Sequence, residues 1–326
     1  MDTITPAPAD AAGRTAPVVR ACGVTRDFGL IKAVDRVDLE IEGGELFGLI
    51  GHNGAGKSTL FKMMLGLLPV SEGEILIHDK RVGGRDFRAV RRDIGYLPEN
   101  VVLYDNLTGL ETLRFFARLK HAPGDSCAAA LEQVGLAHAG HRPVREYSKG
   151  MRQRLGFAQA LLGKPRLLFL DEPTNGLDPE AIRAFYATLR ALRDDGVTIV
   201  LTSHILSEIQ ERVDRLAIMA AGRIQALGTV QALREQVDLP LNVVVQIHHD
   251  QAAAVRALVI PLGVADIPGA EPAGEAGEPG TARLRFACPR PLKMKLLGAL
   301  ANLGEGLIDV TVHEPSLEDV FFGFAD

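Results

Sequence analysis

One segment of this chain has the residue types that bind phosphate. Residues Gly51–Ser58 read GHNGAGKS, and their glycines would let successive backbone N–H groups converge on phosphate oxygens without obstruction by side chains. We expect Lys57 to reach the terminal phosphates of a nucleotide and the Ser58 hydroxyl to bind Mg²⁺. The alternative is a plain glycine-rich turn before a helix. The strand predicted before the segment and the helix predicted after it favour the phosphate loop.

A pair of acidic residues, Asp171 and Glu172, follows the apolar run Leu167–Leu170. Such a run is typical of a parallel strand that is buried on both faces, and ligands bind at the carboxyl ends of strands in open α/β sheets. We expect Asp171 to hold Mg²⁺, directly or through water, and Glu172 to polarise an attacking water as general base. The alternative is an ordinary strand end followed by an acidic turn, which the presence of a phosphate loop disfavours.

His204 stands just after another apolar strand, which is predicted at 198–201. A neutral imidazole at such a strand end could contact the γ-phosphate of a nucleotide and detect its loss. A lone histidine is more often a surface residue or a helix cap. Only its position at a strand end after the acidic pair favours the catalytic interpretation.

A second segment that could contact phosphate is Ser148–Gly150, where a helix is expected to begin. The Ser148 hydroxyl and the backbone N–H groups of Lys149 and Gly150 could donate to an anion. The phosphate loop already has a complete cradle, so this segment would serve a nucleotide held by a second copy. The alternative is a helix N-cap with an exposed basic face formed by Arg152 and Arg154.

The elements predicted around these residues alternate between strands and helices, which is typical of an α/β fold. Apolar runs predict strands at 18–24, 37–41, 45–50, 74–77, 94–97, 167–170, 198–201, 215–220 and 223–227. Helical spacing predicts helices at 58–68, 126–134, 149–162, 179–193 and 206–212. Thr108 and Glu111 are expected to form a capping box before one more helix. A helical subdomain at about 100–165 is therefore inserted into a domain that spans 18–240.

The two ends of the chain differ from this central domain. Residues 1–17 are rich in Ala, Pro and Thr, lack the pattern of a secretory signal, and are expected to form a disordered tail. Residues 241–326 are predicted to form a small α+β domain. It would contain strands at 241–247, 283–286 and 307–312, helices at 251–262, 291–303 and 317–324, and a flexible loop at 268–281.

Composition excludes several classes of protein. The 326 residues carry a formal net charge of −5, which gives no reason to expect a nucleic-acid partner. The three cysteines lie far apart, which argues against a disulfide framework or a structural zinc site. No stretch approaches the roughly 20 apolar residues of a membrane-spanning helix. If the protein works at a membrane, we expect a partner to supply the spans.

Together these segments resemble the nucleotide-binding subunits of ABC transporters, over about residues 18–237. That family has an aromatic residue, a Walker A motif, a Q-loop, a signature, a Walker B motif, a D-loop and an H-loop. The matching positions, in the same order, are Phe28, Gly51–Ser58, Tyr96–Glu99, Tyr147–Arg154, Leu167–Glu172, Asn175–Asp178 and His204. The chain departs from the usual pattern in the Q-loop and in the signature. Glu99 replaces Gln in the Q-loop, and Lys149 and Met151 replace Gly and Gln in the signature.

The resemblance implies an ATPase that assembles head to tail with a second copy, each ATP lying between Walker A of one copy and the signature of the other. It implies Lys57, Glu172 and His204 as catalytic residues, and Ser58, Asp171 and Glu99 as the Mg²⁺ site. The implied ATP-binding residues, with Phe28 stacked on adenine, are Phe28, Gly51, Asn53, Gly54, Gly56, Lys57, Ser58, Thr59, Glu99, Ser148, Gly150, Asp171 and Asp178. It also implies a membrane permease as partner, no nucleic acid, and a peripheral location on the cytoplasmic side of the inner membrane.

Several stretches are more similar to one branch of this family, the Nos-type copper-maturation ATPases of the nitrous oxide reductase system. They are GHNGAGK at 51–57, GYLPENV at 95–101, YSKGMRQRLG at 147–156, AQALLG at 158–163 and PSLEDV at 315–320. This branch implies a role in denitrification, with periplasmic accessory proteins reached through the permease. We expect no copper to bind here, because Cys22, Cys127 and Cys288 form no cluster of soft ligands and are interpreted as buried, inert thiols.

Two other functions stay open. One is the ATPase of a generic ABC exporter of a drug, lipid or peptide, because the motor motifs do not reveal the cargo. The other, a soluble ABC ATPase that acts on ribosomes or DNA, is disfavoured because such proteins usually carry two motor halves or a long coiled coil.

A basic stretch is expected to be a solvated face, with permease or lipid-headgroup contact as its alternative; it comprises Lys80, Arg81, Arg85, Arg88, Arg91 and Arg92.

Overall fold

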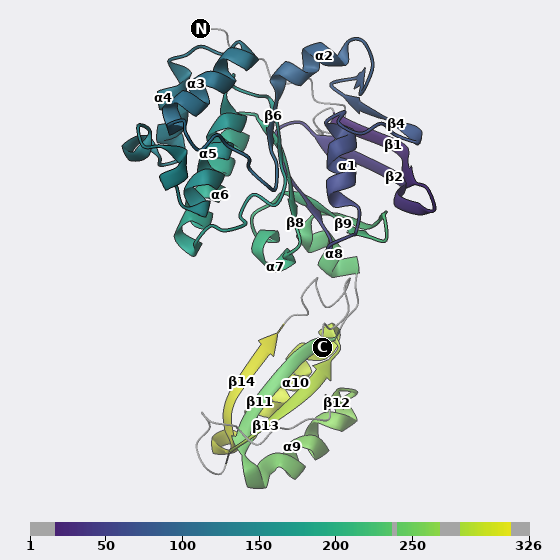
Figure 1. Ribbon diagram of the computed structural model, residues 1–326. Coiled ribbons are helices and arrows are strands. Elements are labelled where there is room, and N and C mark those ends of the chain that lie inside the picture. The colour runs from purple at the N-terminus through teal and green to yellow at the C-terminus, as the bar shows by residue number, and fades with distance from the viewer. Residues whose placement is uncertain (1–16, 237–239, 268–280, 314–326) are drawn as a thin grey trace. The chain divides into compact units, whose positions relative to one another are not determined.

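The computed structural model describes residues 17–236, 240–267 and 281–313. The chain divides into two compact units, Met1–Val230 and Gln231–Asp326, and each is described by itself (Figure 1). The first unit contains all the residues that we predicted to contact the nucleotide.

A six-stranded sheet runs through the first unit in the order β10-β9-β3-β8-β7-β6. Its members are β3 (Leu46–Ile50), β6 (Ile94–Leu97), β7 (Leu167–Leu170), β8 (Thr198–Ser203), β9 (Arg215–Ala220) and β10 (Arg223–Gly228). The first five pair in parallel, and β10 forms the predicted hairpin with β9. Every residue of β3, β7 and β8 is buried, as expected for parallel strands that are covered on both faces. The predicted α/β fold is confirmed.

A second sheet of the first unit is antiparallel, in the order β2-β1-β4-β5. It consists of β1 (Pro17–Phe28), β2 (Ile31–Glu42), β4 (Glu72–Ile77) and β5 (Lys80–Arg81). β1 and β2 are longer than predicted because a tight turn joins them into a hairpin, in which Gly29 has a φ of 64° that glycine adopts without strain. β1 begins at Pro17, the last residue of the predicted tail. The prediction of a buried thiol is wrong for Cys22, which is exposed on β1, whereas Cys127 and Cys288 are buried.

Helix α1 (Lys57–Met64) lies between the two sheets (Figure 1). Leu60 and Phe61 of this helix join a core cluster with residues of both sheets, and the Phe61 ring meets Phe169 of β7 edge-on at 5.3 Å. The helix ends four residues before its predicted end because Gly66 takes a left-handed φ of 66°, which terminates the helical backbone.

The predicted helical subdomain contains α3 (Gly109–Lys120), α4 (Ser126–Gln133) and α5 (Lys149–Leu161). Its capping box is confirmed: the Glu111 N–H donates to the Thr108 hydroxyl at 3.2 Å, and the Thr108 N–H donates to the Glu111 carboxylate at 2.9 Å. Back in the core, α6 (Pro179–Asp194) follows β7, and α7 (Leu206–Ile209) is shorter than the predicted helix at 206–212. A short helix that we did not predict, α2 (Phe87–Val90), buries Phe87.

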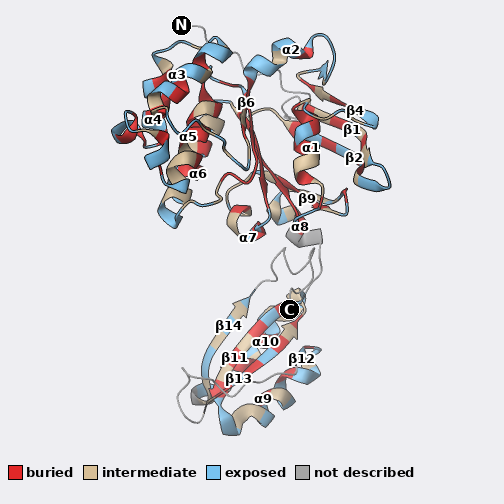
Figure 2. Ribbon diagram, in the orientation of Figure 1, coloured by how far each residue is buried: buried red, intermediate tan, exposed pale blue. Residues whose placement is uncertain are grey.

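The second unit is built around a four-stranded antiparallel sheet, in the order β12-β13-β11-β14. Its elements are α8 (Val230–Gln236), β11 (Leu241–His248), α9 (Ala252–Val259), β12 (Ala265–Ile267), β13 (Thr281–Cys288), α10 (Lys293–Ala301) and β14 (Leu307–His313). From β11 onward this is a split βαβ arrangement. Alternate residues of β11 and β13 are buried against the two helices, so the unit has a hydrophobic core of its own (Figure 2).

Three predicted features lie outside the described residues: the tail at 1–17 except Pro17, the loop at 268–281 except Thr281, and the helix at 317–324 together with the sequence PSLEDV at 315–320. Thr281 begins β13 and does not belong to the loop. None of the helices in the described part of the chain is both long enough and apolar enough to cross a membrane.

Candidate functional site

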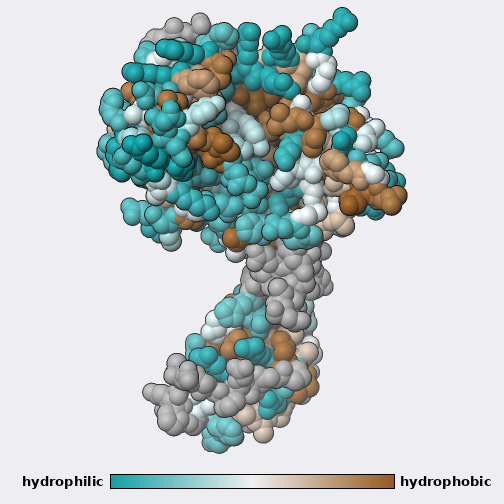
Figure 3. Space-filling view, viewed as in Figure 1, coloured by the Kyte–Doolittle hydropathy of each residue, from teal (hydrophilic) through white to brown (hydrophobic). Residues whose placement is uncertain are grey.

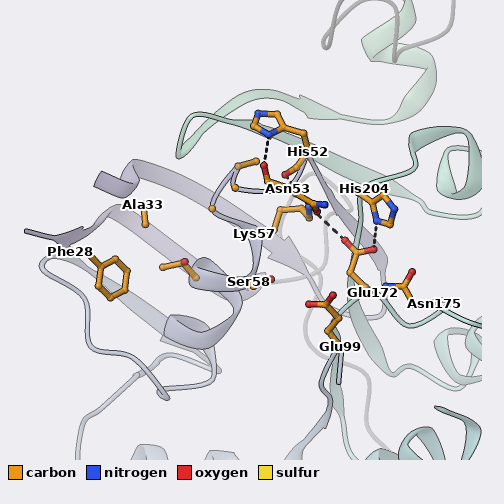
Figure 4. Close-up of a pocket in the computed structure, with 14 residues that line it drawn as sticks. Phe28, Ala33, His52, Asn53, Lys57, Ser58, Glu99, Glu172, Asn175 and His204 are labelled. Carbon is orange, nitrogen blue, oxygen red and sulfur yellow. Dashed lines mark hydrogen bonds and ion pairs between the residues drawn. The ribbon is translucent and has the colours of Figure 1, made fainter. Parts of the chain in front are cut away.

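The predicted phosphate loop connects β3 to α1 and forms one wall of a pocket of about 560 Å³ (Figure 4). At two of its glycines there is no room for a side chain. Gly56 has a φ of 104°, and a Cβ there would collide with the Ala33 carbonyl oxygen; a Cβ on Gly51 would collide with the Met219 carbonyl oxygen. The N-terminus of α1 therefore opens into the pocket behind a loop of backbone N–H groups, an arrangement that suits an anion.

Lys57 is nearly buried at this helix start, with 6% of its surface exposed. Its Nζ donates to the carbonyl oxygens of Gly51 and His52 and lies 3.6 Å from a Glu172 carboxylate oxygen. Burial lowers the pKa of the Lys57 ammonium, and the nearby Glu172 opposes that change. The lysine is thus a cation held at the pocket wall with little water around it, where its attraction to phosphate is strongest.

Glu172 is the residue around which the catalytic candidates gather. One of its carboxylate oxygens lies 3.6 Å from Lys57 Nζ, and the other is hydrogen-bonded to His204 Nδ1 at 2.8 Å. Its backbone has a φ of 47°, a left-handed conformation that is uncommon for a side chain of this size. Such strain is concentrated at functional sites. The structure therefore brings together Lys57, Glu172 and His204, as the sequence predicted.

Thr202 is a site residue for which we predicted no role. Its hydroxyl donates to Asp171 at 2.7 Å and accepts from the Glu172 N–H at 2.8 Å, so one buried side chain fixes both acidic residues. No local pattern in the sequence marks it, because the contact depends on the pairing of two strands. Leu170 of β7 pairs with Leu201 of β8 in parallel register, so the residues that follow them, Asp171 and Thr202, come side by side.

Asp171 and Ser58 lie close enough to share a cation, with 3.5 Å between the Ser58 hydroxyl and a carboxylate oxygen. Burial raises the pKa of Asp171, the Thr202 hydrogen bond lowers it, and the charges of Glu99 and Glu172 raise it. A divalent cation would offset both the burial of the ionised Asp171 carboxylate and its repulsion by Glu99 and Glu172. Hydroxyl and carboxylate oxygens are also ligands that Mg²⁺ prefers, so the residues present fit this ion.

Most of the remaining predicted ATP-binding residues line the same pocket. They are Phe28, Asn53, Gly54, Gly56, Thr59 and Glu99, and the pocket also includes Ala33, His52 and Asn175. Phe28 lies at the end of β1, half exposed, with the Arg26 guanidinium 4.7 Å from the centre of its ring. The ring lies apart from Lys57 and Glu172 (Figure 4), and its exposed part could stack on a flat ligand.

Ser148, Gly150 and Asp178 are not among the lining residues of this pocket. Ser148 caps α5 by accepting from the Met151 N–H at 3.2 Å, and Asp178 caps α6 by accepting from the Ala181 N–H at 2.8 Å. The two helix starts lie together, since a Cβ on Gly150 would touch the Gly176 carbonyl. In a single copy, the segment that we predicted to be a second phosphate site therefore does not line the pocket of the phosphate loop.

Comparisons with known proteins agree with this geometry. A family model described as ABC transporter matches residues 34–175. The daunorubicin resistance ATP-binding protein DrrA3 of Streptomyces coeruleorubidus is 34% identical over 92% of this chain and 93% of that protein. The phospholipid-transporting ATPase ABCA7 of Homo sapiens is 36% identical over 90% of this chain, which spans only 14% of the length of that protein.

Solved structures show the same similarity. One described as an ATP binding subunit of an ABC transporter has a TM-score of 0.62 and 31% identity, and the match covers 67% of this chain and 92% of that one. A dimeric structure of the ATP-binding cassette MJ0796, bound to ADP and phosphate, has a TM-score of 0.60 and 25% identity and covers 65% of this chain and 98% of that one.

Proposed function

This chain belongs to the family of ABC transporter ATP-binding proteins, and we propose that it binds and hydrolyses ATP to drive a membrane permease. The observation that carries the proposal is the position of Glu172, held between Lys57 and His204 in the pocket of the phosphate loop. Catalysis of phosphoryl transfer requires positioning and charge stabilisation more than covalent chemistry. These residues offer both.

Each residue would have a separate task. The loop N–H groups and Lys57 would bind the β- and γ-phosphates, and Ser58 and Asp171 would hold Mg²⁺, which neutralises phosphate charge when bound. A water between Glu172 and the γ-phosphate would attack phosphorus while its proton passes to the Glu172 carboxylate. The bond from phosphorus to the β–γ bridging oxygen breaks, which leaves ADP and inorganic phosphate. His204 would orient the Glu172 carboxylate through the hydrogen bond at 2.8 Å.

We further propose that two copies bind ATP between them, head to tail. Ser148, Gly150 and Asp178 do not line the phosphate-loop pocket of their own copy, yet Ser148 stands at the N-terminus of α5, and the first N–H groups of a helix can donate to an anion. The dimeric structure of MJ0796 supports the pairing of two copies by similarity. ATP would bridge the two copies, and hydrolysis would remove the bridge.

A permease would dock on the helical subdomain just after Glu99. Large apolar side chains lie exposed there, with 87% of Val102, 57% of Tyr104 and 63% of Leu119 accessible to solvent. Tyr104 also contacts the half-exposed Phe115 ring at 5.9 Å. An apolar surface of this kind is typical of a protein interface. The proposed location is accordingly peripheral, on the cytoplasmic side of the inner membrane.

Hydrolysis and co-purification test this proposal together. The purified chain should release phosphate from ATP in the presence of Mg²⁺, and a tagged copy should co-purify with a membrane protein from its own host. Replacing Val102 and Tyr104 with serine should abolish co-purification with the membrane protein and leave ATP hydrolysis unchanged. A chain that binds no ATP, or that co-purifies with ribosomes or DNA instead, would overturn the proposal.

Two cargo classes are compatible with this motor. Export of an amphipathic molecule, such as a drug or lipid, is supported by the DrrA3 and ABCA7 similarities. Maturation of the copper centre of nitrous oxide reductase, with periplasmic Nos accessory proteins, is supported only by the sequence resemblance at 51–57, 95–101, 147–156, 158–163 and 315–320; no relative named above is a Nos protein. Deleting the gene and measuring the copper content and activity of the reductase separates the two, since a fully loaded reductase excludes the Nos role.

A further inference from the structure

The basic stretch at 80–92 has no part in the site described above. It contains Lys80, Arg81, Arg85, Arg88, Arg91 and Arg92 against one acidic residue, Asp86, so its net charge is +5 (six minus one) in a chain whose net charge is −5. We refer to these six cations as the basic face. All six are exposed, and hydrophilic side chains project from the edge of the first unit that carries α2 (Figure 3).

The basic face is presented by an anchored element. Phe87 of α2 is buried in the core, and the Arg91 guanidinium stacks on its ring at 5.5 Å while donating to the carbonyl oxygen of Gly66 at 3.1 Å. This contact ties α2 to the end of α1. The other side of α2 is thereby fixed toward solvent.

Four of the six cationic side chains have no ion-pair partner among the described residues. Arg81 lies 3.8 Å from Glu74 and Arg91 is bound to carbonyl oxygens, whereas the side chains of Lys80, Arg85, Arg88 and Arg92 make no hydrogen bond or ion pair with the described part of the chain. Leu67 follows Gly66 and is 57% exposed, so an apolar side chain stands beside the cations. Cations next to a protruding apolar side chain are characteristic of surfaces that bind at the boundary between lipid headgroups and acyl chains.

We propose that the basic face docks on anionic phospholipid headgroups of the membrane that holds the permease. The long, unpaired side chains project from an exposed edge, and an extended anionic surface can satisfy all of them without a shaped recognition site. Each such cation contributes about a fivefold gain in binding near an anionic bilayer. Because the chain as a whole is negative, the local positive charge would also orient it on the membrane. The inference rests on the proposed role at a membrane and adds a lipid contact to it.

Sedimentation of the full chain with vesicles tests the inference. The chain should bind vesicles that contain phosphatidylglycerol, should not bind vesicles of phosphatidylcholine alone, and should be released by salt. A triple variant, Arg85→Gln, Arg88→Gln and Arg92→Gln, should lose binding by a factor on the order of a hundred. The matched control, Arg190→Gln, Arg283→Gln and Arg285→Gln, removes the same charge from exposed residues elsewhere and should bind as the wild type does.

The outcomes separate this inference from the proposed function. Equal vesicle binding by the two triple variants would overturn the lipid inference. It would also be overturned if the Arg85, Arg88 and Arg92 variant lost co-purification with the permease but kept its vesicle binding, because that result would assign the basic face to a protein partner. Neither outcome affects ATP hydrolysis, which should keep its rate in both variants. Absence of hydrolysis in the wild type would overturn the proposed function instead.

Discussion

At the scale of single residues, Glu172→Gln isolates the role of one carboxylate. Glutamine keeps the size of the side chain but cannot accept the proton of the attacking water. We expect kcat for ATP hydrolysis to fall by about 10²–10⁴-fold, the range that a general base contributes, while ATP still binds and an ATP-bound dimer accumulates in size-exclusion chromatography. Glu180→Gln, which changes an exposed residue of α6, is the control. Hydrolysis that is undiminished in the Glu172 variant would exclude it as the base.

Thr202 offers a second test at the same scale, because its hydroxyl joins the two acidic residues. Thr202→Val removes both hydrogen bonds and leaves the Glu172 N–H and the Asp171 carboxylate without a buried partner. We expect a loss of about 1–3 kcal/mol in the free energy of unfolding, measured with urea, together with a lower kcat. Thr202→Ser keeps the hydroxyl and should retain most of the activity. Equal kcat values for the two variants would show that the hydroxyl does not position Glu172.

The contrast between Glu172 and Thr202 shows what a sequence can reveal about a site. Lys57, Glu172 and His204 were predictable because each follows an apolar strand, and the carboxyl ends of parallel strands meet at one edge. Their contacts were not, because the distances depend on strand order, which no local pattern encodes. The role of Thr202 became visible only once β7 and β8 were known to be neighbours in register.

At the scale of elements, the capping box of α3 predicts a pH dependence of stability. Hydrogen bonds from the Thr108 N–H and hydroxyl lower the pKa of Glu111 below its ordinary value of 4.5. A carboxyl whose pKa is lower in the folded state stabilises the fold above that ordinary value, and the contribution is lost as the pH falls through the folded pKa. Glu111→Gln should therefore unfold with a weaker pH dependence between neutral pH and the acid region, measured by urea titration at each pH.

Thr108→Ala is the companion variant for this element. It removes the N-cap and should cost about 1 kcal/mol of stability at neutral pH, because an orphan N–H group of α3 loses its acceptor. Thr108→Ser should restore the cap. If Glu111→Gln and the wild type show the same slope of stability against pH, the carboxylate does not contribute through the box.

The ends of elements were harder to predict than their existence. The capping box was readable because both partners lie within four residues of each other. The end of α1 at Met64 was not, because Gly66 has to leave room for α2: a Cβ there would crowd Phe87 and Arg91. Helix α2 itself is only four residues long and is defined by the burial of Phe87, a tertiary contact without a local pattern.

At the scale of the whole molecule, Ser148→Arg tests whether two copies share ATP. An arginine at the start of α5 would occupy the space that the neighbour's phosphates need, while the pocket of its own copy stays intact. We expect ATP binding by a single copy to persist, and both hydrolysis and ATP-dependent dimerisation to fall. Ser148→Ala removes the same N-cap and hydroxyl without adding bulk, so it should weaken dimerisation much less than the arginine variant does. Equal dimerisation by the alanine and arginine variants would contradict the shared site.

The two units have separate hydrophobic cores, which predicts separate responses to ligand. The ATP pocket is lined by residues of the first unit, so Mg²⁺ with a non-hydrolysable ATP analogue at about 100 times its Kd should stabilise that unit by about 2.7 kcal/mol. Its calorimetric transition should rise by about 5–10 °C, and that of the second unit should not move. Leu284→Ala, in the second core, should reduce the free energy of unfolding of the second unit by about 2–5 kcal/mol. Only the second calorimetric transition should then move to a lower temperature. A single transition that shifts as a whole in both experiments would show that the two cores unfold as one.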